Sequence, residues 1–412
     1  MIKFDKFTLQ NGLKVIVHHD PSTTLVAFNI LYHVGSKNES PDKTGFAHLF
    51  EHLMFEGSIH IPSYDRPLQL AGGENNAFTT NDITNYYITL PKENIETAFW
   101  LESDRMFGLD FSQKKLDIQK NVVIEEFNQN YLNQPYGDSS LLLRPLAYKV
   151  HPYQWATIGK DISHIQNADL EDVRNFFMHH YAPNNAILSI SGNVKTDEIK
   201  TLSEKWFAPI EKREIALRVI SKEPEQLKAR TQTVYRNVPF DAIYIAFHMS
   251  SKLENDYYVA DLISDLFANG KSSRLYQSLV KTKQLFSDIN AYITGDIDEG
   301  LFIITGKVMS TVKINDAETA IWEEINQLSN GNIDDYEIEK VKNKFESVYE
   351  FGQLSALNKA MDLAYHELLG DAERINQEIE KYRRVTKDEI QKTASKIFNR
   401  KNSSTLYYLS KK

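Results

Sequence analysis

The first 35 residues carry patterns typical of β-strands. Two short strand-like segments stand on either side of Asn11-Gly12, and Asn-Gly is the strongest short-range signal for a hairpin turn. Residues 25–34 are rich in β-branched and aromatic side chains, which is typical of a strand at the centre of a sheet. The chain therefore begins with a predicted hairpin followed by a central strand.

Helical and strand patterns then alternate through the first half of the chain. Apolar residues recur at the spacing of an amphipathic helix in residues 95–106, 116–127 and 197–207. Residues 75–90 alternate well enough for one long strand or a hairpin, and the apolar residues 187–192 predict a buried strand. The first half therefore combines strands with several helices.

The pattern of the first half begins again near residue 240. Residues 242–248 match the strand at Val26, and residues 259–266 match a helical pattern at residues 46–53. Three apolar positions recur between the two helices and pair Ala47 with Ala260, Leu49 with Leu262 and Leu53 with Leu266. A repeat of roughly 200 residues is long enough to be a duplicated domain, although two helices can also match by chance.

The length of 412 residues exceeds one ordinary hydrophobic core, so it also favours two domains. A stretch that is charged and poor in pattern separates the two halves and fits a linker. We predict residues 1–212 as the first domain, residues 213–229 as the linker and residues 230–412 as the homologous second domain.

Composition narrows the classes of function. The net charge of −9, with no basic block to offset it, disfavours nucleic acid and anionic membranes as partners, and no apolar run is long enough to span a bilayer. The absence of cysteine excludes thiolate chemistry and cysteine-ligated metals, so oxygen and nitrogen atoms must carry any metal chemistry. The amino terminus has no signal-peptide pattern, which predicts a cytoplasmic protein, or a periplasmic one if the native start lies upstream.

Candidate chemistry is concentrated in the apolar helix at residues 46–53. His48 and His52 are four residues apart and lie one above the other on a helix, with Glu51 beside them. Two imidazoles so placed can hold one cation while the carboxylate reaches a water molecule, and His-x-x-Glu-His is the inverzincin zinc signature. The alternative is a chance pair of histidines with this spacing.

A catalytic zinc site normally has three protein ligands and one open position. The third ligand has to come from another element, and the acidic pair Glu125-Glu126 interrupts an otherwise apolar helix pattern. Counted from Val122, the two carboxylates fall at i+3 and i+4, so periodicity leaves the choice between them open. A solvent-exposed helix edge is the alternative for both.

The motif and its surroundings resemble the pitrilysin-type metallopeptidases, and the short chain resembles the branch that contains the mitochondrial processing peptidase. The similarity lies in segments from both halves, namely residues 34–36, residues 45–58, Gly72-Gly73-x-x-Asn76-Ala77-x-Thr79, His151-Pro152-Tyr153, Tyr181-x-Pro183-x-Asn185 and Gly270-x-Ser272-Ser273-Arg274-Leu275. The resemblance implies an α+β fold with two homologous domains related by duplication, each a mainly antiparallel sheet with helices packed against it. Residues 230–412 would lack the metal ligands.

The resemblance also implies the roles of individual residues. The third ligand would be Glu126, which lies at the family's distance from His52, and one Zn²⁺ would bind per chain. Glu51 would act as the general base of an endopeptidase that hydrolyses unstructured peptides. Asn76, Ala77 and Phe78 would lie on a substrate-binding edge strand, which holds an extended peptide through main-chain hydrogen bonds.

Two departures from the family pattern concern supporting residues. Gln119 stands where the family usually carries a glutamate that supports the metal site from the outer shell. Val280 and Ser287 stand where active members carry an Arg and a Tyr that polarise the substrate carbonyl, and Arg274 and Tyr276 belong to the preceding segment.

We therefore expect a catalytic subunit that needs a homologous, non-identical subunit carrying the Arg/Tyr pair. A homodimer would not supply the pair, because a second copy brings the same Val and Ser. The alternative function is a non-proteolytic scaffold or assembly subunit that retains a metal site. His and Glu ligands also suit divalent metals other than zinc.

Overall fold

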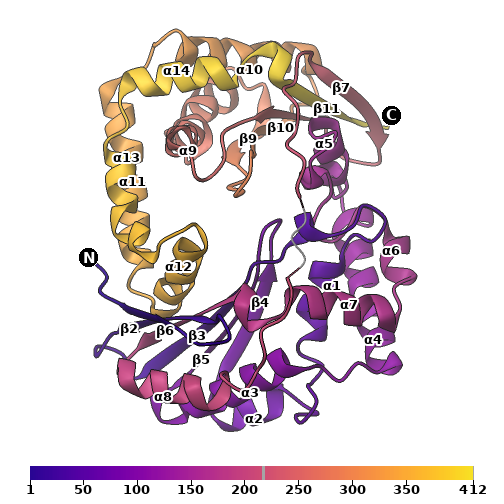
Figure 1. Ribbon diagram of the computed structural model, residues 1–412. Helices are drawn as coiled ribbons and strands as arrows, with labels where there is room; N and C mark the ends of the chain where they lie inside the picture. The colour runs from indigo at the N-terminus through magenta and orange to yellow at the C-terminus, as the bar shows by residue number, and fades with distance from the viewer. Residues whose placement is uncertain (216–218, 412) are drawn as a thin grey trace. The chain divides into compact units, whose positions relative to one another are not determined.

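The computed structural model describes residues 1–215 and 219–411, which form two compact units, each built around one sheet (Figure 1). Unit 1 comprises Met1–Asn128, Trp155–Ile220 and Glu350–Gln377, and unit 2 comprises Gln129–Gln154, Ser221–Tyr349 and Glu378–Lys412. Residues 216–218 of the predicted linker lie outside the described residues. Both units are interleaved along the chain.

The described residues of unit 1 form one six-stranded sheet in the order β1-β2-β6-β3-β5-β4. Its strands are β1 (Asp5–Thr8), β2 (Lys14–His19), β3 (Leu25–Tyr32), β4 (Glu74–Thr79), β5 (Thr84–Pro91) and β6 (Ala186–Gly192). β1 and β2 pair antiparallel around Asn11-Gly12, and β3 lies between β6 and β5, so the predicted hairpin and central strand are confirmed. Residues 75–90 form the β4–β5 hairpin, the second of the two predicted alternatives.

Helices cover this sheet. Those in unit 1 are α1 (Phe46–Leu53), α2 (Asp65–Leu70), α3 (Ile95–Phe107), α4 (Gln113–Phe127), α6 (Ile162–Gln166), α7 (Leu170–His180), α8 (Thr196–Trp206) and α12 (Ala356–Leu368). α12 comes from the carboxyl-terminal half of the chain, yet it packs against β3 and β6 (Figure 1). Its Leu363 and Ala364 are buried with Ile16, Leu31 and Ile187 of the sheet. A distant segment therefore completes the core of unit 1.

Unit 2 has a five-stranded sheet in the order β7-β11-β8-β10-β9 among its described residues. Its strands are β7 (Arg230–Arg236), β8 (Ala242–His248), β9 (Phe286–Ile293), β10 (Leu301–Val308) and β11 (Ser403–Ser410). Its helices are α5 (Ser139–Ala147), α9 (Asn255–Ala268), α10 (Ile314–Ser329), α11 (Asp335–Gly352, which runs on past the division), α13 (Glu378–Arg383) and α14 (Lys387–Ile397). α5, from the amino-terminal half, packs on β11 and β8.

The two sheets share one topology. Taken in chain order, the last five strands of unit 1 and the five strands of unit 2 occupy the same sheet positions. Each sheet also has one parallel pair at the same place, β2 with β6 and β7 with β11, and its other neighbours are antiparallel. The predicted α+β class, with two domains of mainly antiparallel sheet and packed helices, is confirmed.

The internal match between helices also has a structural basis. α1 follows β3 and α9 follows β8, and the paired apolar residues of the two helices are all buried. α12, from the second half of the chain, belongs to unit 1, and α5, from the first half, belongs to unit 2, so neither compact unit is one continuous segment. The continuous domain boundaries 1–212, 213–229 and 230–412 remain a prediction about the repeat.

No helix in the described ranges is long and apolar enough to cross a bilayer.

Candidate metal centre

The ionisable side chains of helix α1 lie on the face opposite the hydrophobic core of unit 1. Its apolar residues Phe46, Ala47, Leu49, Phe50 and Leu53 are buried, as the helical period requires. His48, Glu51 and His52 therefore share the remaining face and are only partly buried. The amphipathic pattern alone is enough to gather the three side chains of the motif on one side.

The third predicted ligand comes from α4, which packs against α1. Glu126 Oε2 lies 3.4 Å from His48 Nε2 and 3.6 Å from His52 Nε2, and the two Nε2 atoms are 3.4 Å apart. Tetrahedral zinc with bonds of about 2.0–2.1 Å places neighbouring ligand atoms about 3.3–3.4 Å apart. The three side chains therefore fit a zinc ion, and the exposed Glu125 is not part of this group.

The ionisation of His48 suits a metal ligand. Burial, with a smaller contribution from the charge of His52, lowers the pKa of His48 to about 4. A neutral imidazole offers the lone pair that a metal requires. The other ring nitrogen of His48, Nδ1, is buried without a hydrogen-bond partner among the described residues.

Glu51 stands outside the ligand group and is held by a different element. Its Oε2 accepts a hydrogen bond of 2.6 Å from Thr79 Oγ1, at the end of β4. Burial raises the pKa of Glu51, and the hydrogen bond from Thr79 acts in the opposite direction. The carboxylate of Glu51 is therefore not one of the three predicted ligands, and it can accept and release a proton.

The predicted substrate-binding residues lie on the edge strand β4. Within the described sheet, β4 pairs only with β5, so its outer backbone edge is open. Asn76 and Phe78 are exposed, and Ala77 lies between them on the opposite face. Thr79, which the sequence interpretation gave no role, follows two positions after Ala77 and so faces α1. Its sequence signals were this two-residue period and its place in the segment Gly72–Thr79 that resembles the family.

The predicted supporting residue Gln119 contacts a different group from the one expected. Its Nε2 donates a hydrogen bond to Glu56, which follows α1, instead of to a predicted ligand. Its Oε1 is buried and has no hydrogen-bond partner among the described residues. Gln119 therefore links α4 to the segment after α1, and its role toward the metal stays a prediction.

Val280 and Ser287, the positions at which the sequence predicted the absence of the family's Arg/Tyr pair, both lie in unit 2. Val280, in the π-helical segment Tyr276–Thr282, packs against the hydrophobic core. Ser287 on β9 donates a hydrogen bond of 3.3 Å to the carbonyl oxygen of Lys307. Arg274 forms two hydrogen bonds with Glu337, of 3.0 and 2.6 Å. Its guanidinium is thus engaged in a structural ion pair.

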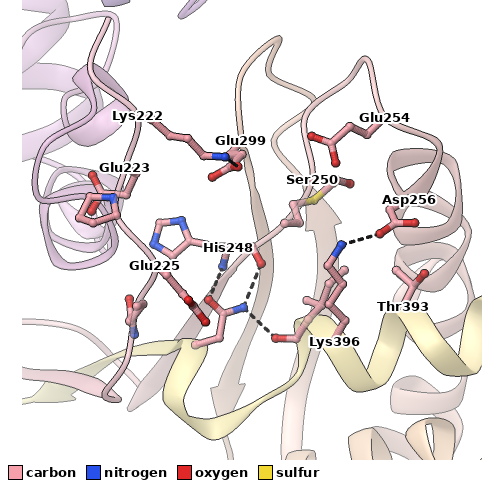
Figure 2. Close-up of a pocket in the computed structure, with 15 residues that line it drawn as sticks. Lys222, Glu223, Glu225, His248, Ser250, Glu254, Asp256, Glu299, Thr393 and Lys396 are labelled. Atoms are coloured by element: carbon pink, nitrogen blue, oxygen red, sulfur yellow. Dashed lines mark hydrogen bonds and ion pairs between the residues drawn. The ribbon is translucent and has the colours of Figure 1, made fainter.

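A pocket of about 260 Å³ is lined by residues of unit 2, as drawn in Figure 2. Its lysines are already paired, since Lys222 Nζ lies 2.6 Å from Glu299 Oε1 and Lys396 Nζ lies 2.7 Å from Asp256 Oδ2. These closed ion pairs are typical of a charged surface. The converging ligand atoms in unit 1 make the stronger candidate site.

Comparisons with known families match both halves of the chain. Residues 14–146 match the family described as insulinase (peptidase family M16), and residues 167–345 match the peptidase M16 inactive domain. The first match contains the His-x-x-Glu-His motif and Glu126, and the second contains α9, Val280 and Ser287.

Individual relatives extend the match to nearly the whole chain. The zinc protease PqqE of Helicobacter pylori is 31% identical over 346 residues, which are 82% of this chain and 78% of that protein. The uncharacterized zinc protease YmxG of Bacillus subtilis is 25% identical over 97% of this chain and 96% of its own length. The crystal structure of a protease from Helicobacter pylori superimposes with a TM-score of 0.93 at 27% identity, covering 99% of this chain and 100% of that one.

The predicted branch has weaker support. A probable mitochondrial-processing peptidase subunit beta of Arabidopsis thaliana is 22% identical over 82% of this chain and 66% of its own length, a lower identity than that of either bacterial protease above.

Proposed function

The chain belongs to peptidase family M16, and from this premise we propose that it is a zinc-dependent endopeptidase that hydrolyses unstructured peptides. The observation that carries the proposal is the spacing of His48 Nε2, His52 Nε2 and Glu126 Oε2, which matches tetrahedral zinc. The names of the relatives PqqE and YmxG support the same chemistry.

His48, His52 and Glu126 would hold the ion and leave one coordination position open. Bound zinc supplies Lewis-acid polarisation of the substrate carbonyl and of the attacking water. Glu51 takes a proton from this water on its carboxylate and delivers it to the amine that leaves when the peptide bond breaks. The hydroxyl of Thr79 fixes the carboxylate during both transfers, because it donates to one of the two oxygens.

The open edge of β4 would bind the substrate. An extended peptide can add to this edge as a further strand, held by main-chain hydrogen bonds. Such binding recognises an extended chain conformation more than a particular sequence, so folded proteins are poor substrates. Asn76, Ala77 and Phe78 would line the bound peptide, and Thr79 places Glu51 at the end of the same strand.

The site is incomplete on the side of the substrate carbonyl. Val280 and Ser287 offer no cation or acidic hydroxyl at the positions of the family's Arg/Tyr pair. Loss of such electrostatic stabilisation typically costs ~10²–10³-fold in rate. The active form would therefore be a complex with a homologous, non-identical subunit that carries the pair, as in the mitochondrial-processing-peptidase-like branch.

The same observation favours the second candidate, a non-proteolytic scaffold that retains its metal site. One experiment separates the two functions. The purified chain, and its Glu51→Gln variant as a control, are assayed for bound zinc and for cleavage of an unstructured peptide, alone and with a homologous subunit that has the Arg/Tyr pair.

We expect one zinc per chain in both proteins, and cleavage only by the wild-type chain together with the partner. Zinc without cleavage under any condition would favour the scaffold. Full activity of the isolated chain would contradict the need for a partner.

A further inference from the structure

The first turn of α1 lacks a capping residue of its own. Its N-cap is Gly45, which has a left-handed backbone with φ of 89° and no side chain to accept a hydrogen bond. A Cβ atom at this position would lie 2.8 Å from the carbonyl oxygen of Ile158, so a capping Ser or Asp cannot replace the glycine. The N–H groups of the first turn need another acceptor.

Glu39 supplies that acceptor from six residues upstream. Its Oε2 accepts a hydrogen bond of 2.9 Å from Gly45 N–H, and its Oε1 accepts one of 2.8 Å from Ala47 N–H. The side chain is only 2% exposed, and it forms no ion pair with a cationic side chain among the described residues, which is unusual for a buried carboxylate. Burial raises the pKa of Glu39 to about 8, and the hydrogen bonds from Ala47 and Gly45 act in the opposite direction.

The loop that carries Glu39 is fixed to the turn between β4 and β5. Lys37 N–H donates a hydrogen bond of 2.9 Å to the carbonyl of Asn81, and its ammonium lies 2.7 Å from Asp82 Oδ1 in a buried ion pair. The indole of Trp155 donates a hydrogen bond of 2.9 Å to the carbonyl of Ser36. The carboxylate is therefore presented to α1 from a rigid support next to the end of β4.

The hydrogen bonds from Glu39 affect the predicted metal site because His48 lies in the helical turn that they stabilise. α1 has only eight residues, and so short a helix is marginal without tertiary support. His48 is the third helical residue, one position after Ala47, whereas His52 lies in the last turn. Fraying of the first turn would move His48 away from His52 and Glu126.

We propose that Glu39 is a positioning residue of the metal centre, which fixes His48 by capping the first turn of α1. The proposal rests on the zinc assignment of the proposed function, and it is independent of peptidase activity. Glu39 is not one of the three side chains that gather at the site, and its effect on His48 passes through the backbone N–H groups of Gly45 and Ala47.

The test measures zinc affinity in competition with a chromophoric chelator for Glu39→Gln and Glu39→Ala. Far-UV circular dichroism and the melting temperature of each metal-free variant show whether it is folded. Glu102→Gln is the matched control, because Glu102 is an equally buried carboxylate of unit 1 whose bonds go to Tyr64 and Arg105 instead of to α1.

We expect the zinc Kd of Glu39→Ala to rise about 10- to 100-fold, the range seen when outer partners of metal ligands are removed. Glu39→Gln keeps one acceptor oxygen, so its zinc Kd should lie between that of Glu39→Ala and that of the wild type. The absorption spectrum of bound Co²⁺ should change in both variants, because the position of one imidazole changes. Glu102→Gln should lower the melting temperature and leave the zinc Kd unaltered.

The proposal would be overturned if folded Glu39→Gln had the zinc Kd and the Co²⁺ spectrum of the wild type and only its melting temperature were lowered, as in Glu102→Gln. Glu39 would then only stabilise the fold. Glu39→Gln is nearly isosteric, so it decides the question even if Glu39→Ala does not fold. Absence of peptidase activity in every protein would count against the proposed function and would leave this result unaffected.

Discussion

At the residue scale, two neighbouring carboxylates on α4 have different environments. Glu126 Oε2 faces both histidines, whereas Glu125 is exposed to solvent. Glu126→Gln should therefore weaken zinc binding by more than the roughly 10- to 100-fold that loss of an outer partner costs, because a neutral amide is a poor zinc ligand. Glu125→Gln should bind zinc like the wild type. Equilibrium dialysis of both variants measures the difference, and the reverse order would assign the third ligand to Glu125.

A second residue-scale prediction concerns Thr79. Thr79→Val removes the hydrogen bond to Glu51, and a hydrogen bond to a charged group contributes about 1.5–3 kcal/mol, so kcat should fall ~10- to 100-fold. Thr79→Ser keeps the hydroxyl and should retain most activity. The assay uses the complex with the partner subunit, and zinc content should stay constant in both variants.

The variant Thr79→Val should also change the dependence of kcat/KM on pH. Glu51 must be ionised to accept a proton, burial already raises its pKa, and the bond from Thr79 lowers it. Removal of the bond leaves the pKa higher still, so the acidic limb of kcat/KM should move to higher pH in Thr79→Val. An unchanged limb together with an unchanged kcat would show that Thr79 does not act on Glu51.

At the scale of elements, α12 is attached to the sheet of unit 1 by apolar packing and by ion pairs. Asp20, after β2, pairs with the ammonium of Lys359 on α12, and hydrogen bonds from Lys359 and Ser22 hold the pKa of Asp20 far below its usual range. A carboxylate whose folded pKa is depressed contributes stability above its unfolded pKa, near 3.9, and this contribution is lost as pH falls below that value.

We therefore expect the free energy of unfolding to fall with pH below about 4, and Asp20→Asn to remove part of this dependence. At pH 7 the substitution should cost about 1.5–3 kcal/mol, the range for hydrogen bonds to charged groups. Chemical denaturation at several pH values measures both effects. Equal stability of the variant and the wild type at pH 7 would show that the Asp20–Lys359 pair does not hold α12.

At the scale of the whole molecule, the interleaving of the two units decides what can fold alone. A fragment of residues 1–212 has the metal centre but lacks α12, whose Leu363 and Ala364 are fully buried against the sheet. Exposure of a buried leucine costs about 1.5–3 kcal/mol, and several such side chains are uncovered together. The fragment should therefore bind the hydrophobic dye ANS and melt at a lower temperature than the intact chain.

A peptide of residues 350–377 added in trans should restore the melting temperature and suppress dye binding. A peptide of the same composition in scrambled order is the control. A fragment that is as stable as the intact chain without the peptide would show that α12 is dispensable for unit 1.

The sequence alone determined most of what depends on local periodicity. The Asn11-Gly12 hairpin, the central strand β3 and the helix α1 follow from patterns of two or 3.6 residues, and the same period places His48 and His52 on one face. The repeat could be predicted because the second half carries the same patterns in the same order, and the α+β class came from the family resemblance. The family resemblance added the choice of Glu126, which periodicity left open.

Only the tertiary structure decided the contacts between residues far apart in the chain. Periodicity cannot tell that α12 crosses into unit 1, that Gln119 bonds Glu56, or that Thr79 reaches Glu51. Glu39 gives no sequence signal either, because its loop has no hydrophobic period and its partners are backbone N–H groups, which every residue except proline offers. These contacts depend on how the chain folds back on itself, and that is set by the packing of whole elements.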